Sequence, residues 1–74
     1  MKTTEVIAKL ERIATRFGYE LETGDEVHQI YFAYAKNLFF HEMEDTFGSL
    51  PNVSWMVMAS PTRKNLTCCI VFVK

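Results

Sequence analysis

The sequence predicts an α+β protein with the element order α-β-β-α-β-β, in which two helices lie on one face of a largely antiparallel four-stranded sheet. Two observations lead to this class. Apolar residues recur with the helical period in two segments, and each of these segments precedes a pair of short runs that resemble strands. Two hairpins covered by two helices form the simplest two-layer arrangement of such elements. We expect residues 1–74 to form one compact domain.

The first helix is predicted near the start of the chain. Its apolar residues are spaced i, i+1, i+4, i+7, i+8 and i+11, which places them in one stripe of an amphipathic helix. They are Val6, Ile7, Leu10, Ile13, Ala14 and Phe17. Thr3 or Thr4 can cap the start of this helix, and Gly18 suits the left-handed conformation that often follows a helix end.

The next stretch predicts a hairpin. Tyr19 and Leu21 alternate with glutamates, residues 23–26 offer a tight turn, and alternation resumes from residue 29 to Tyr34. The alternative is one long helix from Glu26 to Phe47, so residues 26–36 could be strand or helix. Such a helix would be apolar nearly all round, which a domain of this size cannot bury, and this favours the hairpin.

The second helix is predicted to follow Asn37, which suits an N-cap. Its apolar stripe consists of Phe39, Phe40, Met43 and Phe47. Gly48 then suits a left-handed helix end, and Pro51 prevents the helix from continuing. The remaining residues, 52–74, read as two strands joined by a polar turn.

Neither strand of this last hairpin has a clean polar face. We expect Trp55, Val57, Ile70 and Phe72 to turn toward the helices, which leaves an apolar centre on the opposite face of the sheet. Exposed sheet faces are usually polar, and an apolar one is typical of an interface. The residues expected to bind a partner there are Tyr31, Met56, Met58, Cys69 and Val71.

Composition excludes several classes of protein. Hydrophobic residues make up 49% of the chain, which is too many for a disordered tail. The net charge of −1 does not indicate a nucleic-acid or membrane-surface protein. The apolar runs fall far short of the roughly 20 residues of a membrane span, and charges scattered near the N-terminus are not typical of a signal peptide. We expect a cytoplasmic protein without membrane contact.

No motif predicts catalysis, and we expect no catalytic residue, metal or cofactor. The adjacent Cys68 and Cys69 would point to opposite faces of a strand, so a disulfide between them would need unusual geometry, and we expect two structural thiols. The acidic cluster that begins at His41 lacks the second histidine of a zinc-peptidase helix. The weaker alternative is a small metal- or thiol-dependent enzyme around His41 or Cys69.

The expected function is therefore protein binding, either to another protein or to itself as a homodimer. Small size and an apolar-rich, nearly neutral composition suit an inhibitor that a phage or mobile element encodes against a host enzyme, so we expect a viral inhibitor protein. The alternative is a nucleic-acid-binding module that uses basic residues of the first helix and the last turn. Those residues are Lys9, Arg12, Arg16, Arg63 and Lys64.

Overall fold

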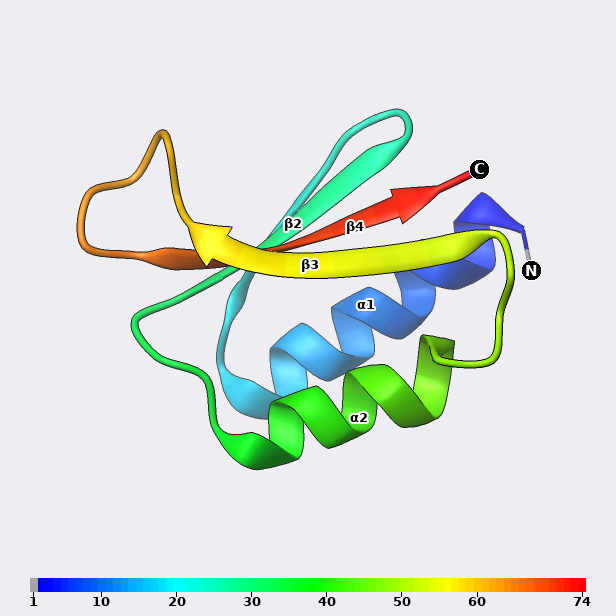
Figure 1. Ribbon diagram of the computed structural model, residues 1–74, viewed down its shortest axis with the longest axis horizontal. Coiled ribbons are helices and arrows are strands. Elements are labelled where there is room, and N and C mark those ends of the chain that lie inside the picture. Colours follow the sequence, from blue (N-terminus) through cyan, green and yellow to red (C-terminus); the bar gives the residue numbers. More distant parts are fainter. Residues whose placement is uncertain (1) are drawn as a thin grey trace.

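The chain folds into a four-stranded antiparallel sheet with both helices on one side of it (Figure 1). The computed structural model describes residues 2–74. The elements, in chain order, are α1 (Thr3–Phe17), β1 (Glu20–Thr23), β2 (Val27–Phe32), α2 (Asn37–Phe47), β3 (Val53–Ala59) and β4 (Thr67–Val73). The strands are arranged in the order β1-β2-β4-β3. The predicted fold class is confirmed, and residues 27–32 form a strand of a hairpin instead of part of a long helix.

The ends of the helices differ in part from the predicted ones. Gly18 is left-handed, with φ of 70°, as predicted for the residue after α1. The predicted N-caps are wrong. The cap positions are occupied by Lys2 and Lys36, which precede Thr3 and Asn37, and neither lysine side chain makes a capping hydrogen bond. The left-handed end predicted at Gly48 is wrong as well. Gly48 is right-handed, and its N–H donates to the carbonyl of Glu44, 2.8 Å away, which continues the helical pattern.

The core lies between the sheet and the helices and is rich in aromatic rings. Phe39 of α2 is fully buried, and its ring centroid lies 5.3–5.8 Å from four other rings. These rings belong to Phe17, Tyr19, Phe32 and Phe40. Edge-to-face and tilted ring pairs of this kind add to the stabilisation that burial provides.

The face assignment predicted for β4 is wrong. Cys69 and Val71 are fully buried and belong to the core that packs under the helices, whereas Ile70 is only half-buried. The strand register explains this placement, because Cys69 lies opposite Ile30 and Val71 lies opposite Trp55, and directly opposed residues share a face. Cys69 and Val71 are therefore not part of the exposed side of the sheet.

Candidate functional site

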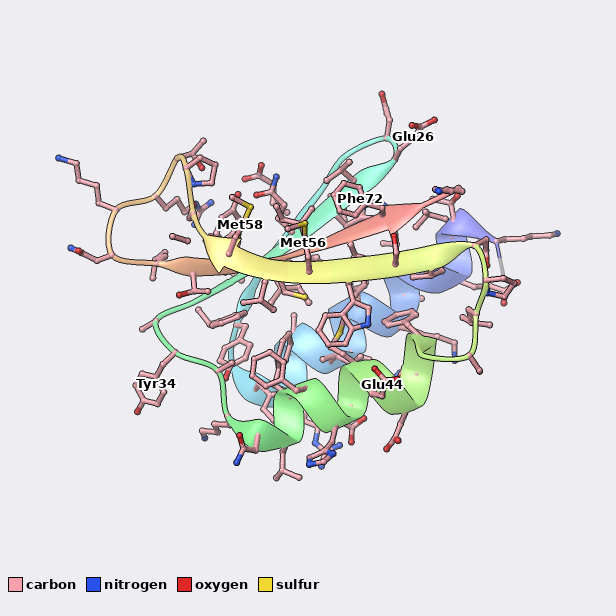
Figure 2. The ribbon with its side chains drawn as sticks, viewed as in Figure 1. Glu26, Tyr34, Glu44, Met56, Met58 and Phe72 are labelled. Carbon is pink, nitrogen blue, oxygen red and sulfur yellow. The ribbon has the colours of Figure 1, made fainter. Side chains whose placement is uncertain are left out.

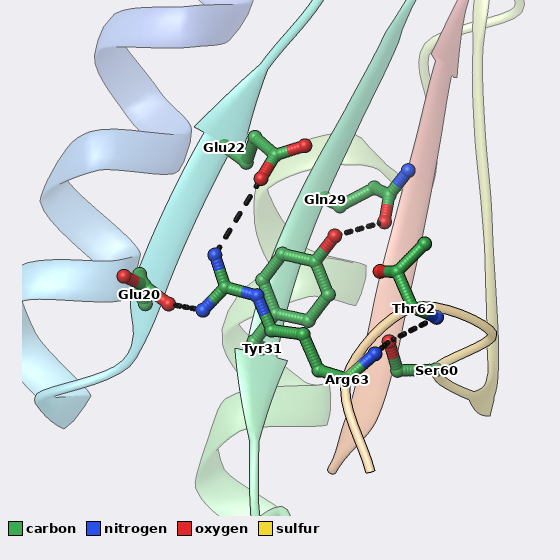
Figure 3. A network of polar contacts seen from close by, with 7 residues as sticks. All are labelled: Glu20, Glu22, Gln29, Tyr31, Ser60, Thr62 and Arg63. Carbon is green, nitrogen blue, oxygen red and sulfur yellow. Dashed lines mark hydrogen bonds and ion pairs between the residues drawn. The ribbon is translucent and has the colours of Figure 1, made fainter.

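The side of the sheet away from the helices, here called the outer face, has two halves of different character. One half is covered by the loop of residues 60–66 that joins β3 to β4. Arg63 in this loop places its guanidinium 4.2 Å from the centroid of the Tyr31 ring (Figure 3). The same group forms ion pairs with Glu20 and Glu22 of β1. The loop thus leaves the Tyr31 side chain only 4% exposed.

Polar contacts hold this loop in place. The Ser60 hydroxyl accepts hydrogen bonds from the backbone N–H groups of Thr62 and Arg63, at 3.4 and 3.0 Å (Figure 3). Asn65 adopts a left-handed conformation with φ of 65°, which asparagine tolerates better than most residues. Under the loop, the Tyr31 hydroxyl donates to Oε1 of Gln29 at 2.5 Å. This half of the outer face is therefore closed by the chain itself.

The other half is apolar and open. We call it the apolar patch and define it by Met56, Met58, Ile70 and Phe72. Met56 and Met58 are 49% and 40% exposed, and Ile70 and Phe72 are half-buried. Met56, Met58 and Phe72 extend from the sheet on the side opposite the helices (Figure 2).

The apolar patch ends at β3, which is an edge strand of the sheet. Val57 on this strand is 37% exposed although it is on the helix-facing side. Its neighbour Trp55 is half-buried and stacks on Phe40 of α2, with ring centroids 6.4 Å apart. The exposed apolar surface therefore continues from the outer face around the edge of the sheet.

The five residues predicted to bind a partner fall into three groups. Met56 and Met58 lie exposed on the outer face, as the alternation predicts. Tyr31 lies on the same face but is covered by Arg63, and Cys69 and Val71 lie in the core. The sequence reasoning missed Ile70 and Phe72, which are the residues that a one-residue change of phase in β4 brings to the outer face.

The basic residues of the nucleic-acid alternative do not form a single surface. Lys9, Arg12 and Arg16 lie on α1, on the helix side of the sheet, and Arg16 forms an ion pair with Glu42 of α2. Arg63 lies on the opposite side, where two glutamates and an aromatic ring engage its guanidinium. Lys64 is exposed in the same loop.

Three buried groups that can titrate lie in the sheet. His28 is fully buried, Nδ1 accepts a 3.4 Å hydrogen bond from the Gly24 N–H, and Nε2 has no partner among the described residues. Burial lowers the pKa of His28. Burial raises the pKa of the Cys68 thiol, and burial together with the neighbouring Cys68 raises the pKa of Cys69 to about 12. Both thiols therefore stay protonated and poorly nucleophilic near neutral pH.

In residues 2–74, neither helix is long and apolar enough to cross a membrane. The same part of the chain places no group of three or more His, Cys, Asp or Glu side chains so that it could hold a metal ion. Comparisons of the chain with protein families, with curated proteins and with solved structures find no match.

Proposed function

We propose that this protein acts by binding another protein through the apolar patch. The observation that carries the proposal is the exposure of two large apolar side chains, Met56 at 49% and Met58 at 40%, side by side with the half-buried Ile70 and Phe72. Removing apolar surface from water is favourable by about 25 cal/mol per Å², so a partner that covers these side chains gains affinity. Apolar patches of this kind are typical of interaction sites.

The contrast between the two halves of the outer face supports the proposal. Where the face carries Tyr31, the chain supplies its own cover, with Arg63 over the ring and glutamates around the guanidinium. No comparable loop among residues 2–74 covers Met56 or Met58. Methionine side chains are flexible and polarizable, which suits a surface that adapts to the shape of a partner.

The mode of action that we propose is inhibition of a host enzyme in the cytoplasm by a protein of phage or mobile-element origin. The small size and apolar-rich composition of the chain support this step. A binder of this size inhibits by occupying a surface that the enzyme needs, and it requires no chemistry of its own.

Affinity purification with matched variants tests the proposal. Met58→Lys introduces a charge into the apolar patch, and Leu38→Lys introduces the same charge at another exposed apolar residue, on α2, where the side chain is 59% exposed. Both lysines can remain in water, so both variants should fold with the circular dichroism of the wild type. A partner captured by the wild type should also be captured by Leu38→Lys, and Met58→Lys should weaken its binding by about 1 kcal/mol or more. Loss of the partner with Leu38→Lys but not with Met58→Lys would assign the interaction to the helix layer.

A further inference from the structure

The two edges of the sheet differ in how well they are protected from pairing with another strand. The β1 edge is four residues long and carries Glu20 and Glu22, with Arg63 held between them. Short, charged edges are the usual protection of natural sheets. The β3 edge is seven residues long, VSWMVMA, and contains no charged residue and no proline. Long uncharged apolar edges of this kind pair readily with other strands.

The hydrogen bonds at the ends of the last hairpin show which groups of β3 point outward. The Lys74 N–H donates to the Asn52 carbonyl at 2.8 Å, and the Ser60 N–H donates to the Leu66 carbonyl at 2.9 Å. Hydrogen-bonded positions alternate along an antiparallel strand, so the even-numbered residues from 52 to 60 bond to β4. The odd-numbered residues from 53 to 59 therefore direct their N–H and C=O groups away from β4, toward the edge. Among these groups, the Val53 N–H is the one with a backbone partner outside the strands in residues 2–74, the Leu50 carbonyl.

We propose that β3 pairs with β3 of a second copy of this chain, antiparallel and centred on Met56. The proposal goes beyond the proposed function, because it concerns the edge of the sheet and a second copy of this chain, not the other protein that the apolar patch binds. Centring the two-fold axis on Met56 overlaps all seven residues of both strands. It also brings the outward groups of the two strands opposite each other, which yields about six interchain hydrogen bonds.

Side-chain pairs across this axis are compatible with a second copy. Trp55 lies opposite Val57 of the second copy, and Val53 lies opposite its Ala59. On the outer face, Met56 meets its own counterpart. The strand has no charge, so pairing two identical strands places no like charges opposite each other. Because Trp55 stacks on Phe40, α2 lies under β3, and the two α2 helices would lie side by side below a continuous eight-stranded sheet (Figure 1).

Complementary charges at the axis test this pairing. The wild type should sediment as a dimer at high concentration and dissociate on dilution. Met56→Lys and Met56→Glu should each weaken dimerisation on the order of tenfold or more, because each places two like charges directly opposite each other. An equimolar mixture of the two variants should restore the dimer. Met56 is 49% exposed in the single chain, so both variants should keep the circular dichroism of the wild type.

Ser54 provides the matched control, since it is an exposed residue of the same strand and face. In the proposed register it lies opposite Met58 of the second copy, so Ser54→Lys brings no like charges together and should change the dimer dissociation constant less than threefold. A wild type that stays monomeric would overturn the proposal. So would a dimer that the two Met56 variants weaken but that their mixture does not restore.

The outcomes also separate this inference from the proposed function. Phe72 lies on β4, so Phe72→Asp alters the apolar patch and leaves every residue of β3 unchanged. If the wild type is monomeric but captures another protein in a manner sensitive to Phe72→Asp and Met58→Lys, only the pairing with a second copy is overturned. If that captured protein also depends on Met56 and supplies an extended strand, the occupant of the edge is a foreign strand. A stable dimer that captures no protein in a Phe72-dependent manner overturns the proposed function and leaves the pairing standing.

Discussion

Lysine substitutions at two neighbouring residues of β4 should have opposite consequences. Val71 is fully buried in the core, whereas Ile70 is half-buried on the outer face. Val71→Lys removes about 1.5–2 kcal/mol of apolar burial and places an unpaired ammonium in the core, which costs several kcal/mol more. A protein of 74 residues has a total free energy of unfolding of about 4–11 kcal/mol. Val71→Lys should therefore leave most of the molecules unfolded.

Ile70→Lys should leave the protein folded. The aliphatic part of the lysine can lie along the apolar patch while its ammonium reaches water, so the expected loss is about 1 kcal/mol. Urea denaturation followed by the fluorescence of Trp55 measures the free energy of unfolding of both variants. The fluorescence reports on unfolding because Trp55 is half-buried against Phe40 in the native state. Val71→Ala serves as the uncharged control and should cost only about 1–3 kcal/mol. A folded Val71→Lys together with an unfolded Ile70→Lys would show that the faces of β4 are assigned backwards.

Three further predictions concern the loop, the thiols and the buried histidine. Arg63→Ala should lower the free energy of unfolding by about 1 kcal/mol, mainly through the lost contact with Tyr31, because the ion pairs are exposed and screened; an unchanged urea midpoint would contradict this. Cys68 and Cys69 should react with a thiol reagent only on unfolding, since both are fully buried, and rapid reaction of the native protein would contradict their placement. Burial lowers the pKa of His28, so below its ordinary value of 6.5 the unfolded chain binds more protons and stability should fall as the pH drops. Urea titrations of the wild type and His28→Phe check this, and an equal loss in both would assign the effect to other groups.

Most of the secondary structure could be predicted because each segment has one dominant period. The stripe of α1 leaves little choice between helix and strand. For residues 26–36 the alternation leaves both structures open, and the strand is favoured because a long apolar helix could not be buried. The phase of β4 could not be predicted in this way. Both of its alternating sets are apolar, so the pattern gives no reason to prefer one set for the core. The pairing of Val71 with Trp55 is what turns Val71 toward the helices.

The cover over Tyr31 depends on tertiary structure that the sequence does not reveal. Whether a turn of seven residues folds back over the sheet depends on its backbone conformation, here including the left-handed Asn65. One signal could have indicated it. Glu20 and Glu22 share the outer face with Tyr31, and such a cluster favours a basic side chain nearby, which Arg63 supplies. The same reasoning would have removed Arg63 from the predicted nucleic-acid surface.

Methionine methyl groups give the most direct test of the claim that the apolar patch and the β3 edge form the working surface. The chain has four methionines, of which Met56 and Met58 are exposed on β3 and Met43 is fully buried in α2. NMR spectra of protein labelled at the methionine methyl groups can be recorded across a concentration series and with the captured partner. The methyl resonances of Met56 and Met58 should shift as the complex forms, while that of Met43 stays in place. Complex formation without a shift at Met56 or Met58 would contradict the claim and place the interaction elsewhere on the molecule.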